Sequence, residues 1–173
     1  LEIGTVKVTV LIETINAVFQ MNEFLWELKD HIVGLNAGRW DYLFSYQKVY
    51  RNTKKVILPD RSKVTMFVPF MSNYNKLLVD TCHKRGAFGM GGMSAQVIAK
   101  SNPKEINEKA LAGVKKDKER ELNQGNDGAW VAHPSLVEPV KNIFEKNFKG
   151  PNQLNKFNNI KINRRDLLDE PKI

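Results

Sequence analysis

Short apolar runs alternate with segments of helical periodicity along this chain, and this alternation constrains its fold more than any other feature. Strands are predicted over residues 6–12, 40–46, 87–93 and 128–132. Helices are predicted after them, beginning near Thr14, Pro69, Glu105 and Ser135. Because strand and helix alternate, the strands should be parallel and joined by right-handed crossovers. The sequence therefore predicts an α/β fold with about four βα units, either half of an eight-stranded barrel or a small open sheet.

Two carboxylates lie at or next to predicted strands, where α/β folds place their active sites. Glu13 directly follows the first strand, and Asp41 lies at the second, just after a glycine-containing loop. In parallel α/β folds the carboxyl ends of the strands form the active-site face. Two acids there, without a cluster of His or Cys, suit a hard cation such as Mg²⁺ with oxygen ligands. The alternative is that each acid caps a helix or pairs with a nearby Arg or Lys.

Four glycines have functional and structural interpretations. Gly34 is predicted to stop the first helix, which ends near His31. Gly34, Gly38, Gly91 and Gly92 also allow close backbone approach and could offer N–H groups to a carboxylate or phosphate. The alternative for Gly91 and Gly92 is a tight turn after the third strand, because their spacing is not that of a dinucleotide fingerprint.

The net charge and the single cysteine indicate the kind of partner and the compartment of this protein. The formal net charge of +8 favours an anionic partner. The lysines of 115–121 alternate with acids, which indicates a solvated helix face with ion pairs four residues apart rather than a nucleic-acid groove. The single cysteine, Cys82, suits a reducing compartment and a core position. No apolar run is long enough to cross a bilayer, and no secretory signal is visible.

The segment after Gly150 changes character, because it is rich in asparagine and lysine. It is predicted to be a linker or arm, which divides the chain into 1–150 and 151–173. The chain begins with Leu1 rather than methionine, so it is expected to be an internal piece of something longer or a processed product.

Several blocks of the sequence resemble the malate synthase family, in its shorter A-type isoform, over nearly the whole chain. The first two are Leu11-Ile12-Glu13-Thr14 and the run from Lys29 to Phe44, with its Gly-Leu-Asn-Ala-Gly-Arg-Trp-Asp-Tyr string. The others follow in the family's order at 58–61, 69–70, 81–87, 91–93 and 130–134.

The resemblance implies a fold and a set of site residues. Residues 1–150 would form the second half of a TIM barrel, and 151–173 would lead toward a C-terminal helical domain outside this chain. Mg²⁺ would be held by Glu13 and Asp41. The glyoxylate site would comprise Gly38, Arg39, Trp40 and Asp41. The acetyl-CoA site would include Gly91, Gly92, Met93, His133 and Pro134.

The resemblance also implies a Claisen condensation of acetyl-CoA with glyoxylate, giving malate and CoA. The family's base, an aspartate, and its enolate-stabilising arginine would lie outside this chain. Neither Asp166 nor Asp169 is assigned as the base, and neither Arg39 nor Arg85 as the arginine. The isolated chain is thus expected to hold the metal site without turning over. The expected compartment is the cytoplasm, or the glyoxysome or peroxisome in a eukaryote.

Two other functions are compatible with parts of the pattern. A Mg²⁺-dependent acyl-CoA lyase of the citrate lyase β-subunit type would use the same two carboxylates, but the Trp40-Asp41-Tyr42 element favours the synthase. A non-catalytic basic binding module would explain the charge, and it predicts nucleic-acid affinity with a steep salt dependence. It gives no reason for acids at strand ends. We therefore expect no nucleic-acid or membrane partner.

Overall fold

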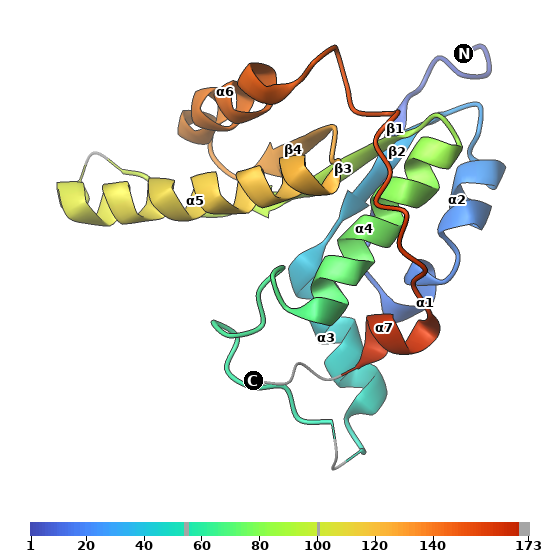
Figure 1. Cartoon of the computed structure of the whole chain (residues 1–173), viewed down its shortest axis with the longest axis horizontal. Coiled ribbons are helices and arrows are strands. Elements are labelled where there is room, and N and C mark those ends of the chain that lie inside the picture. The colour runs from blue at the N-terminus through green and yellow to red at the C-terminus, as the bar shows by residue number, and fades with distance from the viewer. Residues whose placement is uncertain (54–55, 100, 170–173) are drawn as a thin grey trace.

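The computed structural model describes residues 1–53, 56–99 and 101–169. Within these ranges the centre is a sheet of four parallel strands, β1 (Val8–Ile12), β2 (Ile32–Ala37), β3 (Phe88–Ser94) and β4 (Gly128–Val131). Each strand pairs with the next one along the chain, in the order β1-β2-β3-β4 (Figure 1). A barrel has this order, whereas a doubly wound sheet reverses direction partway. The predicted parallel α/β fold is confirmed.

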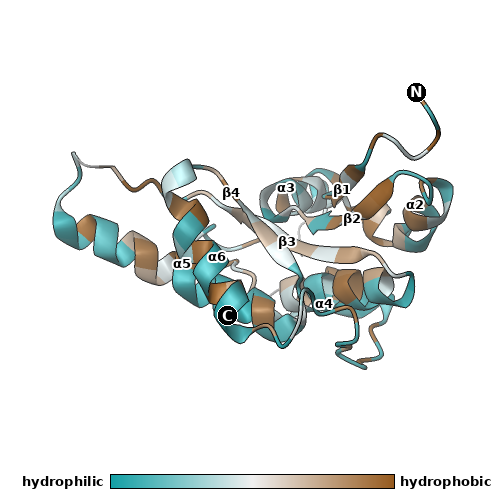
Figure 2. Cartoon of the chain, turned by 90° about the horizontal axis from the view of Figure 1, so that it is seen from above, coloured by the Kyte–Doolittle hydropathy of each residue, from teal (hydrophilic) through white to brown (hydrophobic). Residues whose placement is uncertain are grey.

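Helices follow every strand. They are α1 (Ile15–Val18), α2 (Met21–Glu27), α3 (Arg39–Tyr50), α4 (Pro69–Lys84), α5 (Lys104–Gln124), the 3₁₀ helix η1 (Pro134–Leu136), α6 (Val137–Asn147) and α7 (Arg164–Leu168). Helix α4 packs against β2 and β3, while α5 packs against α6 and β3. In Figure 2, α5 is mostly hydrophilic with hydrophobic residues recurring along it, as expected for a helix with one buried face. No helix in the described part of the chain is long and apolar enough to span a membrane.

The predicted second strand is wrong. Residues 40–46 lie in α3, and the strand is instead Ile32–Ala37. Tyr42 and Tyr46 are four residues apart and both buried, which is the spacing of a helix face. Gly34 does not stop a helix but lies within β2, where a Cβ would come within 2.2 Å of the Phe88 carbonyl oxygen. Its role is close approach of two strands.

Three local predictions need correction. The first predicted helix is two helices, broken at 19–20, although Thr14 is its N-cap as predicted and accepts from the Ala17 amide at 3.2 Å. Gly91 and Gly92 lie inside β3 rather than in a turn after it. Ser135 lies within η1 and does not cap α6.

The main core lies between the first two strands and helices α1 to α4. Its buried members include Ile12, Leu35, Tyr42, Tyr74 and Cys82, so the predicted core position of Cys82 is confirmed. The rings of Tyr42 and Tyr74 stack with centroids 4.5 Å apart. A smaller cluster lies under α5 and α6 and contains Val114, Leu122, Leu136, Val140 and Phe144.

The described part of the segment after Gly150 packs along the main core as far as α7. It runs along α4 to α7, as the red end of the ribbon shows in Figure 1. The hydroxyl of Tyr42 donates to the Leu167 carbonyl at 3.0 Å, and Leu167 is buried in the core. Asp80 accepts from the Asn158 amide nitrogens at 2.9 Å. Of the predicted linker 151–173, residues 170–173 lie outside the described residues.

A buried histidine joins this tail to the sheet. The ring nitrogens of His83 lie 2.7 Å from the Lys156 carbonyl oxygen and 2.9 Å from an Asp127 carboxylate oxygen. Both partners are hydrogen-bond acceptors, an arrangement that favours the protonated imidazole, in which both ring nitrogens donate. Burial lowers the pKa of His83, but these hydrogen bonds and the charges of Asp127 and Asp80 raise it above its usual value overall.

The His83 contact should therefore stabilise the fold most at mildly acidic pH. A raised folded pKa gives stability that is fully present below the unfolded pKa, about 6.5, and lost as pH rises through the folded pKa. We expect Asp127→Asn to lower the free energy of unfolding by about 1.5–3 kcal/mol near pH 6, and by less near pH 9. Urea unfolding at both pH values checks this, with His31→Gln as control. An equal loss at both pH values would contradict it.

Candidate functional site

A cavity of about 460 Å³ opens at the carboxyl ends of β1 and β2. Its lining brings together seven of the residues that the sequence singled out, which are Glu13, Gly38, Arg39, Trp40, Asp41, Gly92 and Met93. The far wall comes from the end of β3 and from α5, with Ser94, Asp117 and Glu121 among its residues. The predicted strand-end site is thus a single concave space.

Glu13 and Asp41 lie against each other in this cavity. Glu13 follows β1, while Asp41 lies in the first turn of α3, directly after β2, and not on a strand as predicted. Burial raises the pKa of Glu13, and so do the charge of Asp41 and a hydrogen bond between the two carboxyl groups. Like charges this close repel each other unless a proton or a cation lies between them.

The donor set fits a hard divalent cation. Two carboxylates supply oxygen ligands, and Mg²⁺ is usually held by one or two carboxylates with water and substrate completing the octahedron. Among the residues that the structure describes, no group of three or more His, Cys, Asp and Glu could hold a metal. The ligands beyond Glu13 and Asp41 would therefore have to be water and substrate. Gly38 leaves room for the pair, since a Cβ there would come within 2.9 Å of a Glu13 carboxylate oxygen.

The amino end of α3 faces the same cavity. Its N-cap is Gly38, and the first amide with a partner inside the helix is that of Tyr42, which donates to the Gly38 carbonyl at 3.2 Å. The amides of Arg39, Trp40 and Asp41 precede it and belong to the helix turn that lacks such partners. These amides and the helix dipole favour an anion at this end.

The α5 wall holds a charged cluster that sequence reasoning missed. Lys118 and Glu121 form an ion pair of 2.9 Å with side chains 0% and 1% exposed. Burial raises the pKa of Glu121, while the charges of Lys118 and Arg120 oppose that rise. Arg120 also pairs with Asp117 at 3.0 Å. The sequence signal that could have predicted this burial is the helical spacing, because Lys118 and Glu121 share a helix face with the buried residues Val114 and Leu122.

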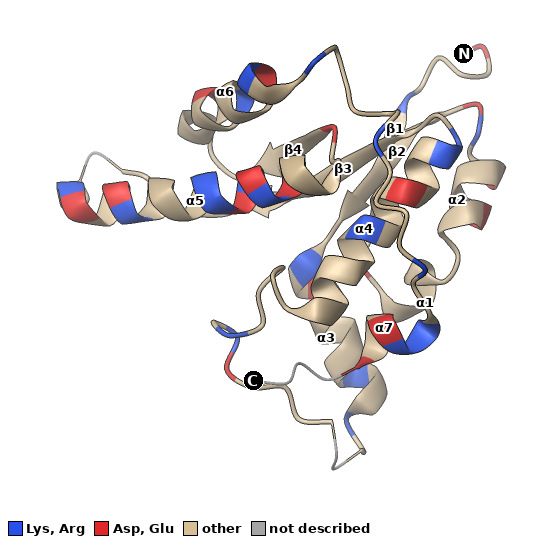
Figure 3. Cartoon of the chain, viewed as in Figure 1, with Lys and Arg blue, Asp and Glu red and all other residues tan. Residues whose placement is uncertain are grey.

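The solvated face predicted over residues 115–121 is wrong for Lys118, Arg120 and Glu121, which are buried. It is confirmed for Lys115 and Glu119, which form an exposed ion pair. Figure 3 shows acids and bases interleaved along α5. Lys104 pairs with Glu108 at 3.7 Å and Lys115 with Glu119 at 3.8 Å, both exposed and four residues apart. Such pairs contribute little to stability, which fits a solvent-facing surface.

The remaining predicted contacts are distributed around the cavity. Gly91 lies in β3 next to the lining residue Gly92, and its carbonyl accepts from the Asn36 amide at 2.8 Å. His133 and Pro134 follow β4, are exposed and do not line the cavity. Their assignment to an acyl-CoA site stays a prediction.

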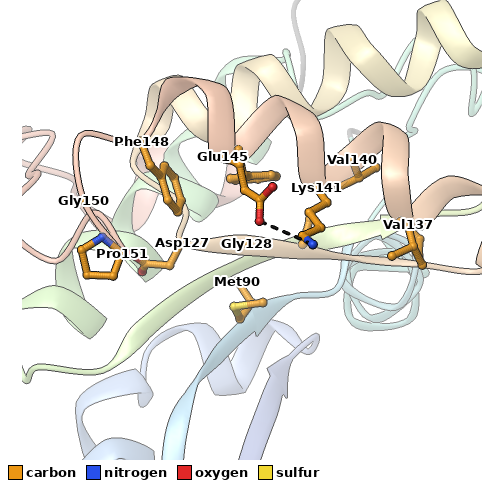
Figure 4. Close-up of a pocket in the computed structure, with 13 residues that line it drawn as sticks. Met90, Asp127, Gly128, Val137, Val140, Lys141, Glu145, Phe148, Gly150 and Pro151 are labelled. Carbon is orange, nitrogen blue, oxygen red and sulfur yellow. Dashed lines mark ion pairs between the residues drawn. The ribbon is translucent and has the colours of Figure 1, made fainter.

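A second cavity, of about 590 Å³, lies between β4 and α6 (Figure 4). Its lining is largely apolar and comes from residues such as Val137, Val140 and Phe148. Glu145 is paired with Lys141 at 3.6 Å. The Asp127 carboxylate already accepts from His83, Gly89 and Gln153. The smaller cavity is therefore the candidate site, because the carboxyl groups of Glu13 and Asp41 lie next to each other in its wall.

A family model described as malate synthase, TIM barrel domain, matches residues 1–170. The chain belongs to the malate synthase family. Its parallel sheet is thus part of a TIM barrel, as the resemblance implied.

Named relatives agree with this family. The chain is 48% identical over 169 residues to malate synthase of Myxococcus xanthus, covering 97% of this chain and 31% of that protein. It is 55% identical over 141 residues to malate synthase A of Escherichia coli, covering 82% and 26%. It is 55% identical over 151 residues to the glyoxysomal malate synthase of Candida tropicalis, covering 87% and 27%. The chain thus spans about three tenths of these malate synthases.

Solved structures share the fold at low sequence identity. A citrate lyase from Burkholderia xenovorans superposes with a TM-score of 0.59 at 18% identity, covering 80% of this chain and 38% of that one. RipC from Yersinia pestis gives a TM-score of 0.55 at 13% identity, covering 80% and 51%. At such identities the likeness shows the fold alone.

Proposed function

We propose that this chain carries the metal-binding part of a malate synthase active site, in which acetyl-CoA condenses with glyoxylate to give malate and CoA. The observation that carries the proposal is the adjacent pair Glu13, directly after β1, and Asp41, in the first turn of α3 after β2, in one cavity. The roughly 50% identity to proteins named malate synthase supports it.

Glu13 and Asp41 would hold Mg²⁺ in this proposal. When bound, the ion supplies Lewis-acid polarisation of the glyoxylate aldehyde. The carboxylates themselves keep the site anionic, and the amide-rich end of α3 provides the complementary positive end.

Gly38 to Asp41 bind and orient glyoxylate in this proposal. The substrate carboxylate accepts from the amides at the start of α3, which fixes its direction relative to Glu13 and Asp41. Arg39 and Trp40 line the same space. Orientation of this kind would raise the reaction rate, because it holds the aldehyde carbon of glyoxylate close to the acetyl group with which it condenses.

The acetyl-CoA contacts are assigned to the opposite wall. Gly92 and Met93 line the cavity at the end of β3, with Gly91 beside them. His133 and Pro134 follow β4, the next strand of the sheet. An acyl group held along this wall would face the glyoxylate held at α3.

The complete reaction is proposed to need a longer protein. Within the described residues β1 and β4 are the edge strands of the sheet, where further strands of a barrel would pair. We propose that residues 1–150 form the second half of the barrel and that 151–173 lead to a further helical domain. That domain and the first half would supply the base and the enolate-stabilising arginine, so the isolated chain is expected to lack turnover. The relatives include bacterial and glyoxysomal proteins, and we propose the cytoplasm or the glyoxysome accordingly.

Release of CoA thiol tests the function. The full-length protein that carries this chain is given acetyl-CoA, glyoxylate and Mg²⁺, and thiol is followed with a chromogenic disulfide. Release that requires both substrates and the cation is expected. Absence of release, with cleavage of malyl-CoA or citramalyl-CoA instead, would contradict the synthase and favour a lyase.

A further inference from the structure

The Lys118–Glu121 pair of α5 holds a single backbone position of β3 from both sides. Glu121 Oε1 accepts from the Gly92 amide at 2.9 Å, and Lys118 Nζ donates to the Gly92 carbonyl at 2.6 Å. Inside a sheet these two groups would normally bond to a neighbouring strand. The side chains of α5 therefore replace part of the sheet ladder.

The sheet is irregular at this position. Pairing of β3 with β4 shifts register between Gly91 and Ser94, so the ladder is interrupted where Lys118 and Glu121 intervene. Bulges of this kind occur beside active sites, where they redirect the side chains that follow. The residues that follow here are Met93 and Ser94, and both line the cavity.

The glycines are explained by the same contact. A Cβ at position 91 would lie 2.1 Å from a Glu121 carboxylate oxygen, and one at position 92 would lie 3.0 Å from the Ala37 carbonyl oxygen. Asn36 of β2 holds the segment from the other side through the Gly91 carbonyl. Contacts from both β2 and α5 therefore fix this short stretch.

Stability alone does not account for a buried ion pair. Taking two charges out of water costs free energy that their attraction often only offsets, and apolar replacements of similar volume are frequently neutral or stabilising. Glu121 also accepts from Arg120 at 3.3 Å, and Arg120 donates to Gln124 at 2.7 Å, which in turn donates to Ser72 at 2.9 Å. The pair is thus hydrogen-bonded both to this buried polar network and to the β3 segment at the cavity wall.

We propose that Lys118 and Glu121 are positioning residues that hold the Gly91–Gly92 stretch of β3 in the conformation that binds the acyl thioester. The proposal rests on the function proposed above. Neither side chain needs to touch substrate, because each acts through the Gly92 peptide.

The test compares charge-balanced variants in the full-length protein. Lys118→Met with Glu121→Leu removes both contacts to Gly92 and substitutes apolar side chains of similar length. Lys118→Met with Glu121→Gln keeps an acceptor for the Gly92 amide. Lys115→Met with Glu119→Gln removes the exposed ion pair of the same helix and is the matched control. Each variant is checked by circular dichroism, and its KM for each substrate and its affinity for Mn²⁺ are measured.

The Leu-containing variant is expected to raise the KM for acetyl-CoA about 10- to 100-fold, the scale of misplacing a bound group by about 1 Å. Its KM for glyoxylate and its Mn²⁺ affinity should stay within about twofold, since the Glu13 and Asp41 side of the cavity is untouched. The Gln-containing variant should recover part of the loss, and the control should match wild type. If the Leu-containing protein does not fold, the same comparison is made with the Gln-containing variant.

Two results would overturn the proposal. One is a folded variant with an unchanged KM for acetyl-CoA, and the other is an equal loss for both substrates and the metal. A failure of the proposed function can be distinguished from a failure of the positioning role, because the wild-type protein would then release no thiol. In that case calorimetric binding of CoA decides: weaker binding to the Leu-containing variant supports the positioning role, and equal binding contradicts it.

Discussion

Replacing either Glu13 or Asp41 by alanine is expected to reduce thiol release by the full-length protein about 10²- to 10³-fold. A bound cation contributes several kcal/mol of transition-state stabilisation, and each 1.4 kcal/mol corresponds to a factor of ten in rate. Because the two carboxyl groups lie together in one cavity, each variant removes one of the two protein ligands proposed for the ion. The two losses should also be far from additive in the double variant, since either alone disables the same ion.

The matched control for these variants is Asp60→Ala. Asp60 is exposed, and its carboxylate accepts local hydrogen bonds from the Ser62 amide and hydroxyl. The control should keep the wild-type rate, and the rates are measured at saturating acetyl-CoA, glyoxylate and Mg²⁺. Near wild-type turnover in either Glu13→Ala or Asp41→Ala would show that the pair does not carry the chemistry.

Tyr42→Ala is expected to cost about 3–5 kcal/mol of unfolding free energy, the usual range for removing a large aromatic side chain from a core. Tyr42 is fully buried and stacks on Tyr74. Its hydroxyl also holds α7 through the Leu167 carbonyl. Since domains of this size are stable by about 5–15 kcal/mol, the variant should unfold at a much lower urea concentration.

Tyr42→Phe separates the ring from the hydroxyl. It keeps the stacked ring and loses one hydrogen bond, so it should cost only about 1 kcal/mol. It should also expose the end of the tail to limited proteolysis more readily than wild type. Urea unfolding followed by tryptophan fluorescence measures both variants. Equal losses in the two variants would show that the hydroxyl contact to α7, and not core packing, dominates.

Local sequence patterns were sufficient to predict β1 and the starts of α4 and α5. The run before Glu13 is β-branched and apolar, and Pro69 and Pro103 mark helix starts, so these elements were predicted near their true positions. The second strand was misplaced because β2 contains Gly34 and Asn36, residues of low strand propensity, next to an aromatic segment of high propensity. What makes Gly34 and Asn36 fit is their contact with Phe88 and Gly91, which lie more than fifty residues away.

The two carboxylates could be located despite that error. Asp41 follows β2 by a few residues, so it reaches the strand-end face whether it lies on a strand or in the first turn of a helix. Lys118 and Glu121 could not be located the same way. Charged residues on a helix usually face solvent, and their burial depends on β3 presenting two glycines opposite them.

Direct binding of Mn²⁺, followed by electron paramagnetic resonance, tests the central claim that Glu13 and Asp41 hold a divalent cation. Mn²⁺ prefers the same oxygen ligands as Mg²⁺ and gives a strong signal when free in solution. Full-length wild type and Asp60→Ala should bind one ion per chain and compete it off with Mg²⁺. Glu13→Ala and Asp41→Ala should bind it at least about tenfold more weakly, as expected from loss of a ligand. Wild-type affinity in both alanine variants would place the metal elsewhere and contradict the account.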